Sequence, residues 1–292
     1  MNQTNPALKI LITDESIMAF LKINSANIYY ELHGEGDPIV LIAGLKADHT
    51  AWIPILNKLA INHRVLIFDN RGTGRTTDEP KHFSLENLAK DVIALIDELE
   101  IIKPHLVGHS MGGAIAQIIA RQYPDDIRSV ALCNTFLKFN ESAKNGFRGI
   151  LDLHKSGATQ TEIIDCILPW GFSSKFLGSD KISAIRAARN ENPYPQSAFD
   201  YERQFQALCD FDSRSWIDQI AIPVLVLGSD EDITATLSES EEIADRIKHS
   251  LFVSMPTGHA SQIENPAAFV EKLQNFYCGF ATFKNDNSSL IF

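Results

Sequence analysis

The stretch Leu106-Val107-Gly108-His109-Ser110-Met111-Gly112-Gly113 joins two kinds of secondary structure. The residues before it form a short apolar run, and residues 113–123 repeat apolar side chains at helical spacing, so we expect a strand, a sharp turn and a helix. In this context Gly-x-Ser-x-Gly is typical of a strained turn that raises a serine hydroxyl above a sheet. We therefore expect Ser110 to be a nucleophile. The N–H of Met111, at the start of the helix, would face a developing oxyanion.

Composition narrows the class of protein. The 292 residues suffice for one large α/β domain with an insertion. The formal net charge of -11 argues against a nucleic-acid partner, because phosphate binding needs a surplus of Lys and Arg. The four cysteines contain no Cys-x-x-Cys pair, so we expect free thiols and no metal. The chain shows no secretory signal and no run of ~18 apolar residues, which predicts a cytoplasmic protein without a membrane partner.

Apolar runs predict the framework of the sheet. Residues 19–32 alternate as an antiparallel edge hairpin does, with a turn at Ser25-Ala26-Asn27. Short continuous apolar runs then predict buried parallel strands at 39–42, 64–68, 105–107, 130–133, 224–227 and 251–253. Helices are expected between them at 50–59, 85–99, 113–123, 238–247 and 266–277.

The alternation of strands and helices stops after Asn134 and resumes at Ile222. The residues between have helical spacing interrupted by prolines, which predicts a helical insertion. We therefore expect a core of residues 1–135 and 215–280, a helical cap of residues 136–214, and a polar tail of residues 281–292.

A serine nucleophile needs a base and an acid that orients it, which follow an elbow serine in the order serine, acid, histidine. Only His249 and His259 lie after the predicted insertion. His249 ends a predicted helix, where a structural role suffices, whereas His259 lies in a loop just past the last strand and is the expected base. Asp230, Glu231 and Asp232 follow the strand at 224–227 and are the candidate acids.

Two further segments make the chain resemble the α/β-hydrolase family over nearly its whole length. The segment from Asp69 to Thr76 is similar to the family's D-x-R-G-x-G-x-S loop, which we interpret as structural. Residues 41–52 resemble the oxyanion loop, with Ala43 in place of the commoner histidine. The resemblance implies that the backbone N–H of Leu45 is the second oxyanion donor, since a main-chain donor tolerates a changed side chain.

The resemblance also guides the choice of acid. In the family the acid comes at a fixed reach from a proline that begins the strand, and a helix follows. Counting from Pro223, and backward from the helix that contains Leu237, favours Asp232. Counting from Gly228 gives Glu231 as the alternative.

The resemblance implies a serine hydrolase with an eight-stranded, mostly parallel sheet, helices on both faces, a helical cap and no cofactor. Ser110, Asp232 and His259 would hydrolyse a small carboxylic ester. A lactone, a vinylogous carbon-carbon bond or a methyl ester on an acyl carrier protein are alternative substrates. A ligand receptor on the same fold is the alternative from another class.

Side chains of the predicted cap bear on these alternatives. Its aromatic residues suggest an apolar acyl pocket, and its cations could meet an acidic carrier. The aromatic residues are Phe147, Trp170, Phe172, Phe176, Phe199 and Phe205, and the cations are Lys181, Arg186 and Arg189.

Overall fold

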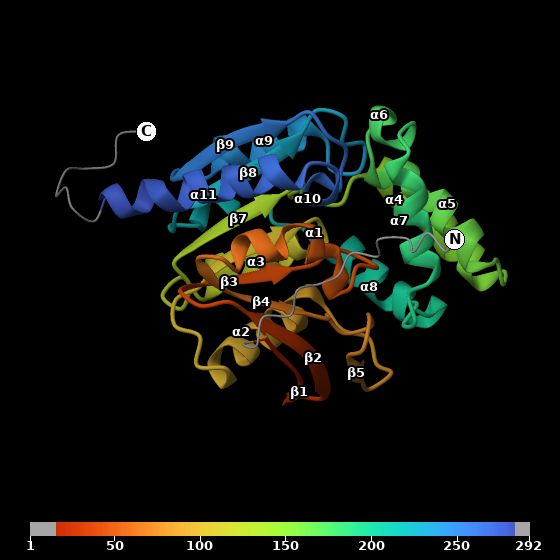
Figure 1. Cartoon of the computed structure of the whole chain (residues 1–292), viewed down its shortest axis with the longest axis horizontal. Coiled ribbons are helices and arrows are strands. Elements are labelled where there is room, and N and C mark those ends of the chain that lie inside the picture. Colours follow the sequence, from red (N-terminus) through yellow and green to blue (C-terminus); the bar gives the residue numbers. More distant parts are fainter. Residues whose placement is uncertain (1–15, 284–292) are drawn as a thin grey trace, which may run out of the picture.

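The computed structural model describes residues 16–283, in which a twisted sheet lies between two layers of helices (Figure 1). Its strands are β1 (Ile17–Ile23), β2 (Ala26–His33), β3 (Asp37–Ile42), β4 (His63–Phe68), β5 (Thr77–Asp78), β6 (His105–His109), β7 (Ser129–Cys133), β8 (Val224–Ser229) and β9 (Ser250–Met255). Their order is β1-β2-β4-β3-β6-β7-β8-β9, with β5 paired to β2.

The predicted architecture is confirmed, with two corrections at the sheet's antiparallel edge. The pairs β1–β2, β2–β4 and β2–β5 are antiparallel, whereas the strands from β4 to β9 along the order pair in parallel. The sheet has nine strands instead of eight, because the two-residue β5 pairs with Ala26 and Asn27 of β2, next to the hairpin turn. The hairpin turn is Asn24-Ser25, since Ala26 already pairs with Ile23.

Both faces of the sheet are buried, which explains the continuous apolar runs of its strands. Val40 and Ile42 pack in one cluster, and Ile39 and Leu41 pack in another on the opposite face. The first cluster includes α2 (Leu85–Glu98), α3 (Met111–Gln122) and α9 (Leu237–Arg246). The second includes η1 (His49–Trp52), α1 (Ile53–Leu59) and α11 (Pro266–Phe283).

The C-terminal helix is longer than expected. Residues 281–283, which we assigned to a tail, continue α11, and residues 284–292 lie outside the described part of the chain. The four cysteines are free thiols, as expected. Within residues 16–283 we find no helix with the length and apolar character needed to cross a bilayer.

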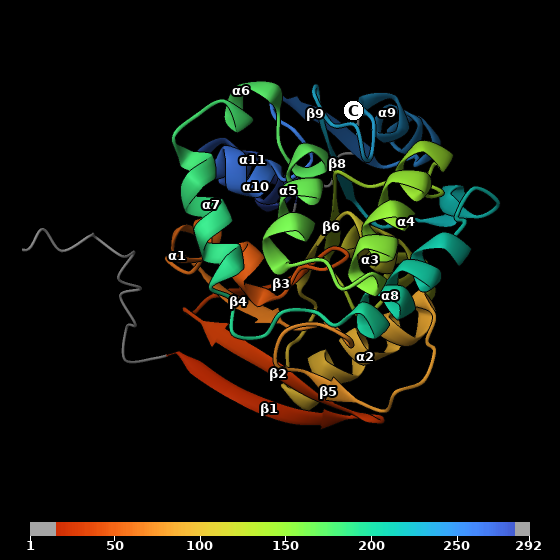
Figure 2. The ribbon, with the colours of Figure 1, turned by 90° about the vertical axis from the view of Figure 1, so that its right-hand side faces the viewer.

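Helices occupy the segment between β7 and β8, as the sequence predicts (Figure 2). They are α4 (Glu141–Lys155), α5 (Gln160–Gly171), α6 (Ser174–Leu177), α7 (Lys181–Asn190) and α8 (Ala198–Asp210). We call them the insertion. Local sequence sets several of their starts, because Asn140, Thr159, Ser173 and Ser197 each accept a hydrogen bond from a backbone N–H of the first turn. The short η2 (Ile217–Gln219) leads back to the sheet.

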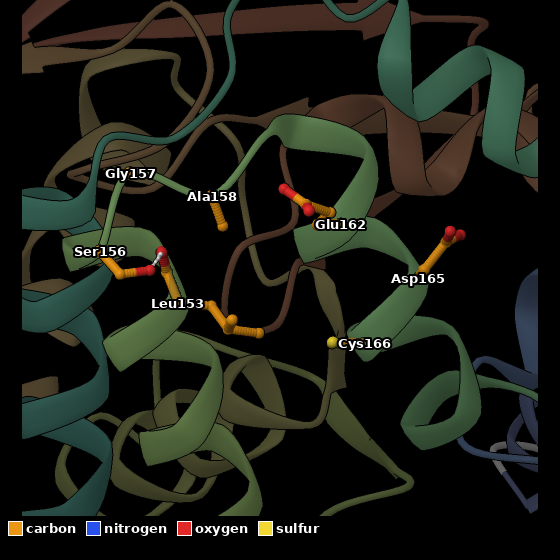
Figure 3. Close-up of a pocket in the computed structure, with 7 residues that line it drawn as sticks. All are labelled: Leu153, Ser156, Gly157, Ala158, Glu162, Asp165 and Cys166. Carbon is orange, nitrogen blue, oxygen red and sulfur yellow. Dashed lines mark hydrogen bonds between the residues drawn. The ribbon is translucent and has the colours of Figure 1, made fainter.

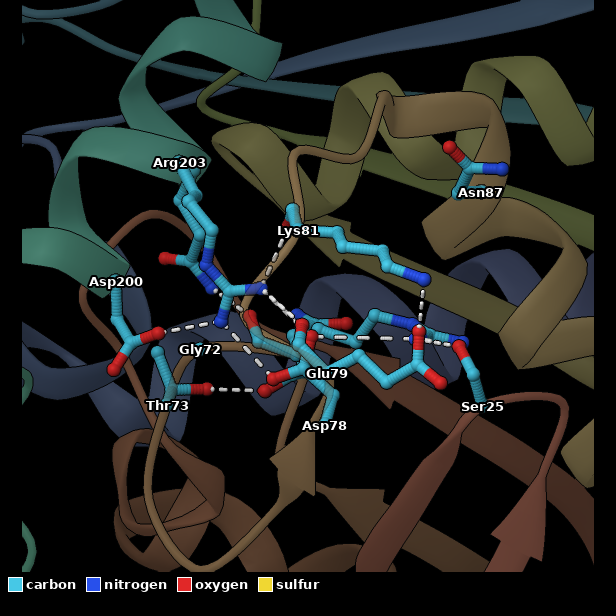
Figure 4. A network of polar contacts seen from close by, with 12 residues as sticks. Ser25, Gly72, Thr73, Asp78, Glu79, Lys81, Asn87, Asp200 and Arg203 are labelled. Carbon is cyan, nitrogen blue, oxygen red and sulfur yellow. Dashed lines mark hydrogen bonds and ion pairs between the residues drawn. The ribbon is translucent and has the colours of Figure 1, made fainter.

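Helix α8 anchors the insertion to the core through a buried ion pair (Figure 4). Arg203 donates two hydrogen bonds to Asp78, at 2.8 Å and 3.0 Å, and also contacts Asp200. The next residue, Gln204, donates to the carbonyl oxygen of Arg71 at 2.7 Å and accepts from the N–H of Lys46 at 3.2 Å. These contacts fix α8 against the loops that follow β3 and β4.

The Arg203 ion pair allows a stability test. Replacing Arg203 with methionine leaves the buried Asp78 carboxylate without its bidentate partner, so we expect a loss of about 3–5 kcal/mol in the free energy of unfolding. Arg214→Met is the control, because Arg214 pairs with Asp212 at the exposed surface and should cost about 1 kcal/mol or less. Urea unfolding measures both variants. Equal, small losses would contradict an anchoring role for Arg203.

Candidate active site

The turn between β6 and α3 has the strained geometry that the sequence predicts. Ser110 adopts φ 56° and ψ -119°, and α3 begins at the next residue, Met111. A Cβ atom at Gly108 would lie 2.3 Å from the carbonyl oxygen of Gly112, and one at Gly112 would lie 2.0 Å from that of Ile42. Only glycine fits at these two positions. The close approach of β6, α3 and β3 therefore dictates the Gly-x-Ser-x-Gly pattern.

Hydrogen bonds to the next strand fix the main chain of Ser110. Its N–H donates to the carbonyl oxygen of Cys133 at 3.0 Å, and its own carbonyl oxygen accepts from the Thr135 hydroxyl at 2.8 Å. The same carbonyl accepts from the N–H of Ala114 at 3.1 Å, which starts the helix. The position of the Ser110 side chain is thus set by β6, β7 and α3 together.

His259 and Asp232 meet directly, at the ends of β9 and β8. His259 Nδ1 lies 2.8 Å from Asp232 Oδ2, and the other carboxylate oxygen accepts from the N–H groups of Thr234 and Ala235. Both side chains are buried. If Nδ1–H donates to Asp232, then His259 Nε2 carries a lone pair and can accept a proton. The alternative acid, Glu231, instead accepts from the N–H of Ser174 at 3.1 Å.

The residue before Ser110, His109, contacts His259 directly. The rings of His109 and His259 are 4.8 Å apart, and His109 Nε2 lies 2.8 Å from the carbonyl oxygen of His259. Burial, with the charge of His259 as a second cause, lowers the pKa of His109 to about 3, so His109 is neutral and donates this bond. In the described part of the chain, no hydrogen bond joins the Ser110 hydroxyl to His259 itself.

Two backbone N–H groups lie beside Ser110. The N–H of Met111 belongs to the first turn of α3 and has no partner within the helix. On the other loop, a Cβ atom at Gly44 would lie 3.0 Å from Ser110 Cβ, so the main chain leading into Leu45 packs against Ser110. Asn70 donates to the carbonyl oxygen of Ala43 at 3.1 Å, which braces this loop without the commoner histidine.

The loop after β4 also braces the loop after β3. One oxygen of Asp69 accepts from the backbone N–H of His49 and lies 2.7 Å from its Nδ1, and the other accepts from the N–H of Arg75. Ligand atoms of Asp48, His49 and Asp69 lie within 4.8 Å of one another, a spacing that could hold a metal. The carboxylates already accept hydrogen bonds, Asp48 from the N–H of Thr50.

The pKa of His49 gives this cluster a second explanation. Burial lowers that pKa, but the hydrogen bond that His49 donates to Asp69 and the charges of Asp69, Asp48 and Glu31 outweigh burial and raise it. The surrounding carboxylates thus favour the protonated form of His49, and that form offsets their charge. The contacts therefore favour a structural role for the loop, and the expectation that no metal is bound stays a prediction.

Two residues that sequence reasoning missed support the acid and the base. Asn134 donates to Asp232 Oδ2 at 3.0 Å and to the Ser229 hydroxyl at 2.9 Å. Glu264, in α10 (Ser261–Glu264), accepts from the N–H of Gly258 at 3.1 Å and from both the N–H and the hydroxyl of Ser173. No local pattern predicts the contacts of Asn134 with Asp232 or of Glu264 with Ser173, because these partners are distant in the sequence.

The aromatic side chains of the insertion pack largely against one another. Phe172 and Phe176 stack with ring centroids 4.9 Å apart, and Phe147 and Trp170 meet edge to face at 5.6 Å. Phe199 is exposed. These contacts indicate that the aromatic side chains form the core of the insertion. They give less support to the apolar acyl pocket that the sequence suggested for the six residues.

A cavity of about 550 Å³ lies between α4 and α5 (Figure 3). It is lined by Leu153, Ser156, Gly157, Ala158, Glu162, Asp165 and Cys166. None of the expected site residues lines it, so this cavity is separate from Ser110.

Comparison with known proteins places the fold. Residues 37–173 match the family model of the alpha/beta hydrolase fold. A pyrrolizixenacetamide deacetylase of Xenorhabdus hominickii is 27% identical over 88% of this chain and 96% of its own. The enol-lactonase of Burkholderia xenovorans LB400 superposes with a TM-score of 0.81 at 26% identity, over 89% of this chain and 99% of its own.

A thermophilic esterase of Thermogutta terrifontis shares the fold at 24% identity. Its TM-score is 0.79, over 90% of this chain and 98% of its own. The shared architecture extends across both the sheet and most of the remaining chain.

The contacts of Glu264 give a prediction about the loop that carries His259. In Glu264→Ala the buried N–H of Gly258 and the Ser173 groups lose their acceptor, so we expect a loss of about 1–3 kcal/mol in the free energy of unfolding. Amide hydrogen exchange at Gly258 should accelerate. Glu271→Ala, at an exposed position of α11, is the control and should stay within about 0.5 kcal/mol. Unchanged exchange at Gly258 would disprove the bracing role.

Proposed function

We propose that this chain, which belongs to the α/β-hydrolase fold family, is a serine hydrolase that cleaves small carboxylic esters through an acyl-enzyme. The observation that carries the proposal is the His259–Asp232 hydrogen bond beside a serine in a strained turn. A nucleophile, a base and an orienting acid are the groups that acyl transfer requires. A protein that only binds a ligand has no need of all three.

In the first half of the reaction, Ser110 Oγ attacks the carbonyl carbon while its proton passes to His259 Nε2. Asp232 holds the imidazole by Nδ1 and stabilises the imidazolium that forms. The carbonyl oxygen becomes an oxyanion, which the N–H groups of Leu45 and Met111 stabilise. When the tetrahedral intermediate collapses, the alcohol leaves with the proton from His259, and the acyl group remains on Ser110.

In the second half, water takes the place of the alcohol. His259 removes a proton from the water as its oxygen attacks the acyl carbon, and the same two N–H groups stabilise the second oxyanion. Collapse returns the proton to Ser110 Oγ and releases the carboxylic acid. The mechanism needs no cofactor.

A lactone is the second candidate substrate, favoured by the likeness to the enol-lactonase. A lactone is a cyclic ester, so the same residues open it, and the leaving alcohol stays attached to the acid. Cleavage of a vinylogous carbon-carbon bond would use the same three side chains.

The acyl carrier alternative receives less support from the contacts of the insertion. Arg186 pairs with Asp165 at 2.7 Å, and Arg189 lies 5.7 Å from the ring centroid of Phe172. The ion pair with Asp165 occupies one of the three cations that an acidic carrier would need. We keep the insertion, residues 136–214, as the proposed cap, and a cytoplasmic location as a prediction.

A substrate series tests the proposal. Wild-type protein should hydrolyse p-nitrophenyl esters, with a rate that depends on acyl length, and Ser110→Ala should reduce the rate to background because no other group replaces the nucleophile. Activity that survives the substitution would disprove the mechanism. No turnover in either protein, together with stabilisation by the ester, would favour the receptor alternative.

A matched pair of substitutions tests the choice of acid. Asp232→Asn removes the carboxylate that holds His259, and we expect kcat to fall by about 10⁴-fold, as in serine proteases. Glu231→Gln keeps a side-chain oxygen for the N–H of Ser174 and should leave kcat close to the wild-type value. The reverse ranking of the two variants would assign the acid to Glu231.

A further inference from the structure

Two cations form no ion pair among residues 16–283. Lys46 follows Leu45 on the oxyanion loop, and Arg189 lies on α7 of the insertion. Among the ion pairs between residues 16–283, within 4.0 Å, none includes either side chain. Both are only half-buried as whole residues, but burial lowers the pKa of each.

Neutral groups surround the Lys46 ammonium. Its Nζ lies 3.2 Å from Nε2 of His154 on α4 and 6.0 Å from the ring centroid of Tyr201 on α8. Burial, with the charge of Lys46 as a second cause, lowers the pKa of His154 to about 4. His154 is therefore neutral near pH 7 and accepts a hydrogen bond from Lys46 without compensating its charge.

Arg189 has one carboxylate in its neighbourhood, and that carboxylate is engaged elsewhere. The charge of Asp48 opposes the effect of burial on the pKa of Arg189. Asp48 Oδ1 accepts from Thr50, and its Oδ2 accepts from Asn192 at 2.8 Å. The Arg189 guanidinium instead lies over the ring of Phe172, at 5.7 Å from its centroid.

Both cations belong to segments of the chain that contact the proposed catalytic loops. Lys46 is two residues after Gly44, which packs against Ser110. A Cβ atom at Gly258 would lie 2.5 Å from the carbonyl carbon of Phe172. Phe172, whose ring Arg189 contacts, therefore packs against the loop that carries His259. The charge of Arg189 also lowers the pKa of Lys46, which places the two cations within electrostatic reach of each other.

Buried cations elsewhere in the molecule pair with carboxylates. Arg71 is paired with Asp91, and Arg203 with Asp78. Removing cations from water costs free energy that a paired anion normally offsets. The chain has a formal net charge of -11. Among residues 16–283, however, no carboxylate forms an ion pair with Lys46 or Arg189, and Asp48 offsets the effect of burial on Arg189 only in part. An anion from outside the chain would supply the missing negative charge.

We propose that Lys46 and Arg189 bind a free carboxylate of the substrate, so that the enzyme acts on esters or lactones that also carry a carboxylate. This inference rests on the proposed function for its reaction, but the binding of the carboxylate can be measured without turnover. In this proposal Lys46 and Arg189 select the substrate. The three proposed catalytic residues carry out the reaction and do not determine which ester is bound.

A specificity ratio tests the inference. The probes are mono-p-nitrophenyl adipate and the neutral p-nitrophenyl hexanoate, with 4-acetoxybenzoate and phenyl acetate as a pair that carries the carboxylate on the alcohol side. In wild type we expect the anionic ester to have the higher kcat/KM in at least one pair. Lys46→Met and Arg189→Met should each lower that ratio about tenfold or more, since a hydrogen bond to a charged group contributes about 1.5–3 kcal/mol.

Exposed cations of the insertion provide the controls. Lys155→Met and Arg186→Met remove charges that already pair with Glu202 and Asp165, and the specificity ratio should stay at its wild-type value. A wild-type ratio near one in both pairs, or a ratio that neither Lys46→Met nor Arg189→Met changes, would overturn the inference. Hydrolysis of the neutral esters would meanwhile support the proposed function, so the two failures are distinguishable.

A binding measurement separates recognition from catalysis. Adipate should raise the thermal midpoint of Ser110→Ala, and this increase should disappear when Lys46→Met or Arg189→Met is added. The midpoints without adipate show whether each variant is folded. An equal increase in all three proteins would place the carboxylate elsewhere.

The pH dependence provides another test. Burial, with Arg189 as a second cause, lowers the pKa of Lys46 to about 8. Of the groups that face Lys46, His154 is already neutral and burial raises the pKa of Tyr201, while Gln204 has no charge. Lys46 therefore loses its charge as the pH rises through about 8, and the preference for the anionic ester should fall there. Lys46→Met should lack this decline.

Discussion

The close packing of β3, β6 and α3 around Gly108 and Gly112 is the constraint on which the proposed site depends. Neither glycine has room for a Cβ atom, so the chain turns from strand to helix within one residue. That turn holds Ser110 at a positive φ, a conformation that costs about 1–3 kcal/mol and persists only where surrounding structure enforces it. The enforcing groups are main-chain atoms of Ile42 and Cys133, which belong to the centre of the sheet.

The insertion is connected to three loops that the proposed chemistry uses, those that carry the acid, the base and Leu45. Thr234, next to the acid, donates to the carbonyl oxygen of Trp170, and Glu264 joins the loop of His259 to Ser173. Gln204 accepts from the N–H of Lys46 on the oxyanion loop. The insertion therefore does more than cover the sheet: it fixes the relative positions of loops that come from distant parts of the sequence. Substitutions in these helices should affect activity without any contact to substrate.

Sequence patterns predicted the parts of the molecule that follow from local chemistry. Continuous apolar runs located the parallel strands because both faces of the sheet are buried, and the glycine pattern located the turn at Ser110. The choice of Asp232 over Glu231 needed the family resemblance, and the structure pairs Asp232 with His259. Their catalytic role stays a prediction.

Other features depend on tertiary contacts and could not be predicted locally. Strand β5 has two residues, too few to form a pattern, and it pairs with Ala26 and Asn27, which lie beyond the part of β2 that pairs with β4. Asn134 and Glu264 act on loops that lie far from them in sequence. Lys46 and Arg189 look like ordinary surface cations until the packing of α4, α7 and α8 around the oxyanion loop is known.

The central claim is that Ser110 is the residue that becomes acylated. Mass spectrometry of the protein after reaction with a fluorophosphonate, which traps serine nucleophiles that have an adjacent base, tests it most directly. We predict one adduct per chain, on the peptide that contains Ser110, and none in Ser110→Ala. An adduct on another residue, or an unmodified protein that still turns over esters, would contradict the account.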